Sequence, residues 1–122
     1  MPGQRKVIAI VDDDQTMLKA VTRLLSAHGF AIQAFDSAEA FLDRAKAADA
    51  ACLVLDIHLG GISGIELRRR LKAVRSKLPV IFITAVDDEA TQQEAMDVGC
   101  VAYLRKPFAA DLLLGAIDKA TR

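Results

Sequence analysis

The chain has 122 residues, of which 52% are hydrophobic, and this length and apolar content suit one globular domain with a single core. Its 16 basic and 16 acidic residues give a formal net charge of zero, which excludes a general electrostatic attraction to nucleic acid, membranes or acidic polymers. Any electrostatic function must therefore come from charges that cluster locally.

The sequence start and the cysteines indicate a cytoplasmic protein. Only five apolar residues directly precede Asp12, too few for a signal-peptide core or a membrane span. Cys52 and Cys100 lie in apolar surroundings and lack the spacing of a metal site or a redox pair, which favours buried, reduced thiols.

Five short apolar runs occur along the chain, and most are continuous rather than alternating. Continuous runs of this length are typical of strands that are covered on both faces of a sheet. The predicted strands are Val7–Val11, Ala31–Phe35, Ala51–Leu55, Val80–Ile83 and Val101–Leu104.

Each predicted strand is followed by a stretch in which apolar residues recur with helical spacing. The apolar positions are Met17, Leu18, Val21, Leu24 and Leu25; Ala38, Phe41, Leu42 and Ala45; Ile65, Leu67, Leu71 and Val74; Ala95, Met96 and Val98; and Leu112, Leu113, Ala116 and Ile117. Suitable caps precede two of these helices, namely Asp36 or Ser37, and Asp87 or Asp88.

Alternation of five strands with five helices predicts a doubly wound α/β domain, with a parallel sheet and helices on both of its faces. Strand order 2-1-3-4-5, the flavodoxin-like arrangement, is one common solution, and its ligands bind beyond the carboxyl ends of strands 1 and 3. The sequence contains no internal repeat or linker, so we predict one domain over residues 1–122, either independent or excised from a longer protein.

Carboxylates follow both of the strands that flank the predicted binding point. Asp12 and Asp13 come directly after the first strand, and Asp56 follows the third. Neighbouring strands are about 4.8 Å apart, and like charges about 4 Å apart repel by roughly 4 kcal/mol at an effective dielectric near 20. Carboxylates without His or Cys partners favour an oxygen-seeking ion, so the cluster predicts a Mg²⁺ site.

A hydroxyl and an ammonium group follow the remaining two strands at the same edge. Thr84 comes after the fourth strand and Lys106 after the fifth. Lys106 is two strands away from Asp56, about 10 Å, a distance that a long flexible side chain can cross. A metal, a lysine and a hydroxyl together describe a site for a phosphoryl group.

Four motifs occur in order at the ends of the predicted strands. They are Val11-Asp12-Asp13-Asp14; Leu55-Asp56 with Leu59 and Gly64 beyond it; Ile83-Thr84-Ala85; and Tyr103-Leu104-Arg105-Lys106-Pro107-Phe108. With this set, essentially the whole chain resembles the receiver domain of response regulators in two-component signalling. The resemblance implies that the domain binds neither nucleic acid directly nor a membrane.

The resemblance also implies the chemistry of the acidic cluster. Asp56 would accept a phosphoryl group from a sensor histidine kinase or a phosphotransfer protein, acting as the nucleophile. Asp13 and Asp56 would bind Mg²⁺ directly, Asp12 mainly through water, and the backbone carbonyl of His58 would complete the protein ligands. Asp14 is better placed to cap the following helix.

Three further residues have implied roles. Lys106 would stabilise the phosphoryl oxygens, Thr84 would bind them, and Tyr103 would follow the movement of Thr84. This switch would remodel the surface of the fourth helix, fifth strand and fifth helix, which forms homodimers or contacts effectors in many relatives. The Lys106-Pro107 bond is expected to be cis, as is frequent in the family.

The chain departs from the family pattern in two segments. Gly60-Gly61 stands where a proline is usual, so we expect a more mobile loop over Leu59 to Ile62 when no metal is bound. The last helix has Ala109 where a capping hydroxyl is common and Gly115 in its interior, so it is either marginal or closely packed through Gly115.

Other functions remain open at this stage. A Mg²⁺-dependent hydrolase could use the same metal and nucleophile, but it usually needs an acid two residues after the nucleophile, where this chain has His58. A nucleotide-binding domain of the same fold would need a glycine-rich phosphate loop after the first strand, where Asp12 to Asp14 would repel phosphate. The basic run Arg68-Arg69-Arg70 indicates a solvated helix face rather than a nucleic-acid site.

Overall fold

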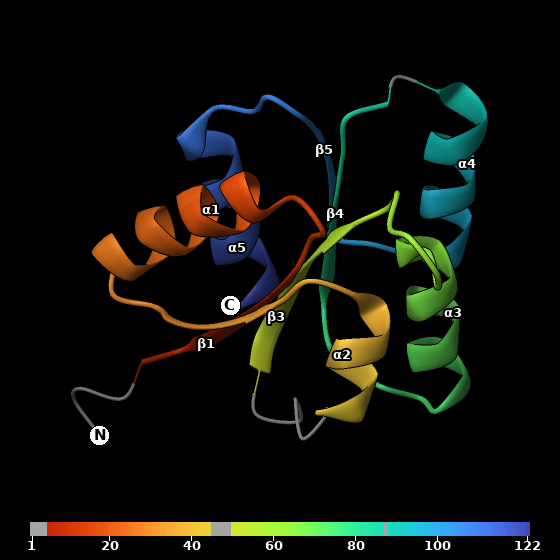
Figure 1. Cartoon of the computed structure of the whole chain (residues 1–122), viewed down its shortest axis with the longest axis horizontal. Coiled ribbons are helices and arrows are strands. Elements are labelled where there is room, and N and C mark those ends of the chain that lie inside the picture. The colour runs from red at the N-terminus through yellow and green to blue at the C-terminus, as the bar shows by residue number, and fades with distance from the viewer. Residues whose placement is uncertain (1–4, 45–49, 87) are drawn as a thin grey trace.

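The computed structural model describes residues 5–44, 50–86 and 88–122 (Figure 1). The strands are β1 (Val7–Val11), β2 (Ala31–Phe35), β3 (Ala50–Asp56), β4 (Val80–Thr84) and β5 (Ala102–Arg105). The helices are α1 (Gln15–Ala27), α2 (Ala38–Asp43), α3 (Gly64–Ala73), α4 (Glu89–Val98) and α5 (Ala110–Ala120). Two positions named above, Ala45 and Asp87, lie outside the described residues.

The five strands form one parallel sheet in the order β2-β1-β3-β4-β5, which confirms the predicted fold. Five strand boundaries differ from the sequence prediction by one residue, namely both ends of β3, both ends of β5 and the carboxyl end of β4. The bond from the Ile57 N–H to the Ile83 carbonyl, 3.0 Å long, continues the pairing of β3 and β4, so Asp56 and Thr84 are the last residues of their strands rather than the first beyond them. Ladder bonds, which a hydrophobic pattern does not encode, set such boundaries.

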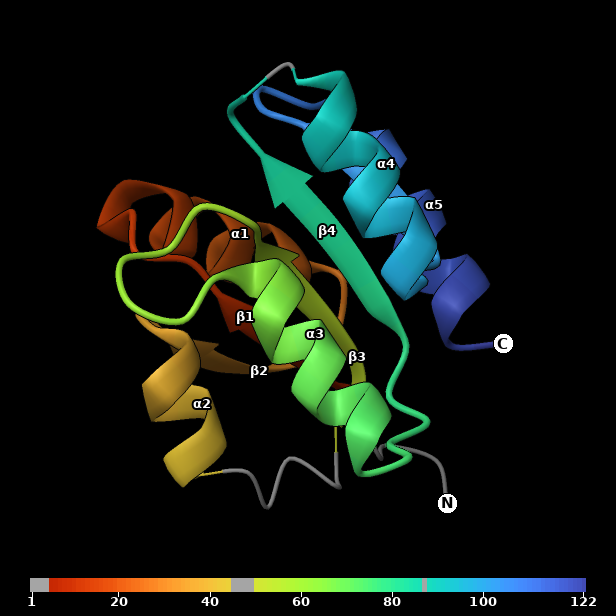
Figure 2. The same ribbon diagram turned by 90° about the vertical axis from the view of Figure 1, so that its right-hand side faces the viewer.

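The sheet is covered on both faces. Figures 1 and 2 show α1 and α5 on one face and α2, α3 and α4 on the other. Successive residues of β1 point to opposite faces, so Ile8 and Ile10 join the core under α1 and α5, while Ala9 and Val11 join the core under α2, α3 and α4. All four are fully buried, which is why β1 reads as a continuous apolar run.

Four helices begin with a side-chain cap. Asp14, Ser37, Ser63 and Asp88 accept hydrogen bonds from the first backbone N–H groups of α1, α2, α3 and α4. Ala109 occupies the corresponding position of α5 and provides no such bond, as the sequence predicts. Gly99 ends α4 with φ of 94°, a conformation that favours glycine.

Several finer predictions can be compared with the structure. The Lys106-Pro107 bond is cis, as expected. Close packing through Gly115 is wrong, because a Cβ atom there would meet nothing within 4 Å. Both cysteines are free thiols, but only Cys52 is fully buried, since Cys100 lies at the rim of the core.

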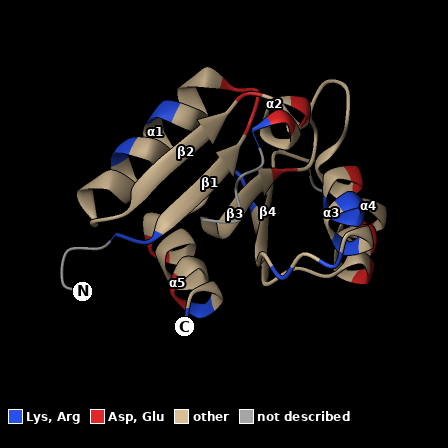
Figure 3. Cartoon of the chain, turned by 90° about the horizontal axis from the view of Figure 1, so that it is seen from below, with Lys and Arg blue, Asp and Glu red and all other residues tan. Residues whose placement is uncertain are grey.

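The basic run on α3, coloured blue in Figure 3, is only partly a solvated face. Arg69 pairs with Glu94 of α4 at 2.8 Å, and Arg70 pairs with Glu66 at 3.2 Å. Arg68 is half-buried instead, and its Nε donates to the Gly99 carbonyl at 2.8 Å, so it ties α3 to the segment before β5. Among the described helices, none has the length and apolar character needed to cross a bilayer.

Candidate functional site

Three carboxylates meet at the carboxyl edge of the sheet. β1 and β3 are neighbours, with Val11 opposite Leu55, so the residues that follow them come together. Carboxylate oxygens of Asp12, Asp13 and Asp56 lie within 4.8 Å of one another. Asp12 and Asp56 are almost completely buried, at 0% and 4% exposure, whereas Asp13 is exposed to solvent.

Lys106 completes this cluster from the end of β5. Its Nζ lies 2.8 Å from Oδ2 of Asp12 and 3.4 Å from Oδ2 of Asp56. The Lys106 N–H donates to the Thr84 carbonyl at 2.7 Å, which fixes the start of the side chain at the edge of β4. The predicted approach to Asp56 is therefore present. The shorter contact with Asp12 has no signal in the sequence, because strand spacing does not determine which carboxylate a flexible ammonium contacts.

The buried charges of this cluster shift the pKa values of Asp56 and Lys106. The pKa of Asp56 is raised to about 6, mainly by burial and next by the neighbouring Asp12 charge, while Lys106 opposes both effects. Burial also disfavours the charged form of Lys106, but the two carboxylates outweigh it and raise the pKa of this ammonium above its usual value.

This arrangement suits a hard cation. Three carboxylates face one ammonium group, so a second positive charge would relieve the repulsion that raises the pKa of Asp56. The candidate ligands are all oxygens, the donors that Mg²⁺ prefers. Asp12, Asp13 and Asp56 therefore fit a divalent cation at this edge.

The other three predicted site residues, Thr84, Tyr103 and His58, differ in their exposure to solvent. Thr84 is fully buried, and its Oγ1 accepts a hydrogen bond from the Val86 N–H at 3.1 Å. Tyr103 is half-buried and lies opposite Phe82 in the β4–β5 register, so it shares with Thr84 the sheet face that α4 covers. His58 is exposed, and its N–H donates to Oδ1 of Asp56 at 3.3 Å.

The loop after β3 is attached to α2 by a contact that sequence reasoning missed. The carboxylate of Glu39, on α2, accepts a hydrogen bond from the Ile62 N–H at 3.0 Å. Gly61 has φ of 79°, and a Cβ atom there would collide with the same carboxylate. The loop that contains Gly60 and Gly61 is therefore held to α2 by this hydrogen bond. Nothing in the sequence signals a contact between residues 23 positions apart.

Gly64 lies still closer to the reactive strand. Its N–H donates to the Ile57 carbonyl at 2.9 Å, and a Cβ atom at this position would collide with the backbone carbonyl of Asp56. The absence of a side chain at Gly64 thus lets α3 begin directly against the end of β3. The motif contains this glycine, but its spacing alone does not reveal the close approach.

The fold and the acidic edge are those of a signalling receiver. The family model of the response regulator receiver domain matches residues 8–118, and the chain belongs to this family. It is therefore a receiver domain of a two-component system, a class of domain that takes part in signal transduction.

Curated relatives include transcriptional regulators. The transcriptional regulatory protein FixJ of Bradyrhizobium diazoefficiens is 39% identical over 115 residues, which cover 94% of this chain and 56% of FixJ. The response regulator protein TodT of Pseudomonas putida is 34% identical over 122 residues, which cover all of this chain and 54% of TodT. The chain thus spans about half the length of these relatives.

Solved structures agree with the sequence relationship. The crystal structure of FixJ-N has a TM-score of 0.88 and 35% identity, and the match covers 97% of this chain and 94% of that one. The BeF3-activated DrrB receiver domain has a TM-score of 0.87 and 31% identity, with 96% and 97% covered.

Proposed function

We propose that this domain accepts a phosphoryl group on Asp56 from a histidine kinase or a phosphotransfer protein, in a reaction that requires Mg²⁺. The observation that carries this proposal is the buried cluster of Asp12, Asp13, Asp56 and Lys106 at the carboxyl edge of the sheet. Membership of the receiver family supports the same assignment.

The reaction is a transfer between nitrogen and oxygen. A carboxylate oxygen of Asp56 attacks phosphorus in the phosphohistidine of the partner, so an O–P bond forms while the N–P bond breaks and its electron pair returns to the imidazole. Lys106 stabilises the charge on the phosphoryl oxygens. Asp13, Asp56 and the His58 carbonyl would hold Mg²⁺ directly and Asp12 mainly through water, and the ion would add positive charge beside these oxygens.

The proposed readout begins at Thr84. A phosphoryl group on Asp56 offers an acceptor for the Thr84 hydroxyl proton, and movement toward it would draw Oγ1 away from the Val86 N–H, from which it now accepts a hydrogen bond. Movement of Thr84 frees space on the sheet face that it shares with Tyr103. The face formed by α4, β5 and α5, where Met96 and Leu112 are exposed, then changes its ability to form a homodimer or to contact an output domain.

We further propose that residues 1–122 form one receiver domain of a longer response regulator. The support is the length of the relatives, since the chain matches about half of FixJ and TodT. The identity of the remaining segment would determine which process the phosphorylation controls.

A direct test uses Mg²⁺ and acetyl phosphate as a small phosphodonor. We expect intact mass spectrometry to show the addition of one phosphoryl group to the wild type and none to Asp56→Asn, and sizing of both proteins would report dimer formation. Without Mg²⁺ the mass gain should disappear. A phosphoryl group that still appears on Asp56→Asn would overturn the assignment.

The same proteins distinguish the receiver from an aspartyl-phosphate hydrolase. A receiver takes up one phosphoryl group per chain, whereas a hydrolase would turn over a phosphomonoester continuously. No acid stands at His58, where such a hydrolase usually carries its proton donor. Continuous release of phosphate from p-nitrophenyl phosphate, dependent on Asp56, would favour the hydrolase.

The lifetime of the phosphorylated state should depend on Val86. This residue is apolar and 40% exposed, so its side chain cannot orient a water molecule for attack on the acyl phosphate. We expect Val86→Glu to lose its phosphoryl group faster than the wild type, with Val86→Leu as the apolar control. An unchanged or slower loss in Val86→Glu would contradict this role.

A further inference from the structure

The strand β2 forms one edge of the sheet, and within the described residues no further strand pairs with it. The N–H of Ala31 and the carbonyl of Phe35 are both bonded to residues that flank β1, at 3.0 and 3.1 Å. Backbone groups of successive residues in a strand point to opposite edges, so those of Ile32 and Ala34 face outward. β2 therefore presents the hydrogen-bonding groups that an added strand would use.

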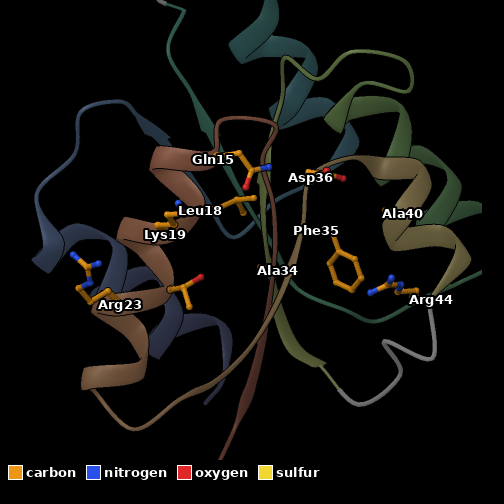
Figure 4. Close-up of a pocket in the computed structure, with 10 residues that line it drawn as sticks. Gln15, Leu18, Lys19, Arg23, Ala34, Phe35, Asp36, Ala40 and Arg44 are labelled. Carbon is orange, nitrogen blue, oxygen red and sulfur yellow. The ribbon is translucent and has the colours of Figure 1, made fainter.

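A groove of about 660 Å³ follows this edge between α1 and α2 (Figure 4). Ala34 lies in its middle, where a small exposed side chain leaves the backbone accessible. Gln15 and Leu18 line it from α1, and Ala40 lines it from α2. Its volume is within the range of about 300–1,000 Å³ typical of binding clefts.

The charged residues that line the groove are mainly basic. Lys19 and Arg23 lie one turn apart on α1, and Arg44 extends from the end of α2 toward Phe35 (Figure 4). Among the lining residues that the structure describes, Asp36 is the one acid. Within the described residues, none of the three cations is in an ion pair. In a chain without net charge, this concentration of positive charge selects a particular kind of ligand.

We propose that the groove binds an extended acidic segment of a partner protein, which joins the sheet as a strand beside β2. Its backbone pairs with the outward groups of Ile32 and Ala34, the mode by which many peptides add to a sheet edge. Side chains of the added strand alternate between the α1 side and the α2 side. Acidic side chains on the first side meet Lys19 and Arg23, and those on the second meet Arg44.

Charge also decides against a second copy of this chain as the occupant. Two β2 edges paired about a twofold axis would bring Lys19, Arg23 and Arg44 of both copies together. Like charges placed across an interface are unfavourable and suppress such partners. An acidic strand avoids this repulsion and neutralises the groove.

The test uses a fluorescent eight-residue peptide in which pairs of Glu alternate with pairs of Thr, so that acids lie on both sides of the added strand. Binding is followed by fluorescence anisotropy at low and high salt. We expect saturable binding that weakens at least tenfold in the double variant Lys19→Glu, Arg23→Glu and that weakens as salt is added. Lys119→Glu, an exposed charge reversal on α5, is the matched control and should bind as the wild type does. A peptide with Lys in place of Glu should not bind.

Backbone pairing is tested separately from charge. A peptide with the same sequence and N-methylated amides on one edge should bind at least fivefold more weakly, and hydrogen exchange at the Ile32 and Ala34 amides should slow when the unmodified peptide binds. Equal binding of the methylated peptide, or protection elsewhere in the chain, would overturn strand addition. Dimer formation by the isolated domain through β2, or preferential binding of an oligonucleotide at this groove, would likewise overturn the proposal. Circular dichroism of each variant establishes that it is folded.

Discussion

Helices α3 and α5 lie on opposite faces of the sheet, and their first turns are attached to the rest of the domain in different ways. Ser63 caps α3 through the Glu66 N–H at 3.1 Å, and Gly64 bonds the end of β3 directly. In contrast, Ala109 precedes α5 and provides no side-chain cap, and a Cβ atom at Gly115 would meet nothing within 4 Å. The helix next to Asp56 is therefore fixed by local backbone contacts, whereas α5 depends on the burial of its apolar residues.

This difference matches the two tasks that we propose. The start of α3 helps to hold the strand that ends in the phosphoacceptor, where a displacement would change the geometry of the reaction. Helix α5 belongs to the face that would respond to phosphorylation, and weakly stabilised elements change conformation at a lower cost. Four substitutions, two of them paired with a comparison variant, test this contrast between α3 and α5.

The largest expected effect on stability concerns Asp56, the last residue of the strand against which α3 begins. Its pKa is raised from about 3.8 to about 6, so the folded state binds more protons than the unfolded state between these pH values. The stability of the metal-free wild type should therefore fall as pH rises through this window, by about 3 kcal/mol when complete. Asp56→Asn removes this penalty and should be more stable than the wild type above pH 6.

Urea unfolding in EDTA at a series of pH values measures this difference. The two proteins should converge below about pH 4, where the wild-type carboxyl is protonated in both states. A constant difference in the free energy of unfolding from pH 4 to pH 8 would contradict the proposed origin of the effect.

Gly64→Ala should destabilise the domain by about 2 kcal/mol, because the new Cβ collides with the backbone at Asp56 and Ile57. Gly60→Ala is the matched control in the same loop, since a Cβ atom there meets nothing within 4 Å. Urea midpoints compare the two variants. If Gly64→Ala were as stable as Gly60→Ala, the start of α3 would not be closely fixed to β3.

Ala109→Ser should stabilise the domain by about 1 kcal/mol by supplying the cap that α5 lacks. The backbone at Ala109 already has the extended conformation of a capping residue, with φ of −70° and ψ of 144°. Ser63→Ala, at the start of α3, is the converse change and should cost a similar amount. Thermal unfolding of both variants would show shifts of opposite sign, and shifts of the same sign would contradict the comparison.

Gly115→Ala should give the smallest gain in stability, somewhat below about 1 kcal/mol. Alanine has fewer conformations than glycine in the unfolded chain, so it loses less entropy when α5 forms. The position is exposed and has room for the methyl group. The urea midpoint should rise while the slope of the unfolding curve stays the same. A loss of stability would mean that Gly115 has a packing role after all.

The sequence predicted most of the fold because its signals are local. The apolar runs identified all five strands, and the alternation of strands and helices led to the observed order. The acidic cluster followed from this topology, since Asp12 directly follows β1 and Asp56 ends the neighbouring strand β3. Features that depend on contacts between distant segments were predicted less well. Close packing through Gly115 was wrong, and the hydrogen bond from Ile62 to Glu39 was not predicted.

By itself, therefore, the sequence determined the strand order, the family and the acidic edge, because hydrophobic periodicity and the residues at strand ends are properties of neighbouring positions. Only the tertiary structure decided that Lys106 contacts Asp12 more closely than Asp56, that Gly64 lies against the Asp56 backbone, and that a basic groove runs along β2. Such features depend on how side chains from distant segments share space, and no short stretch of the chain contains that information.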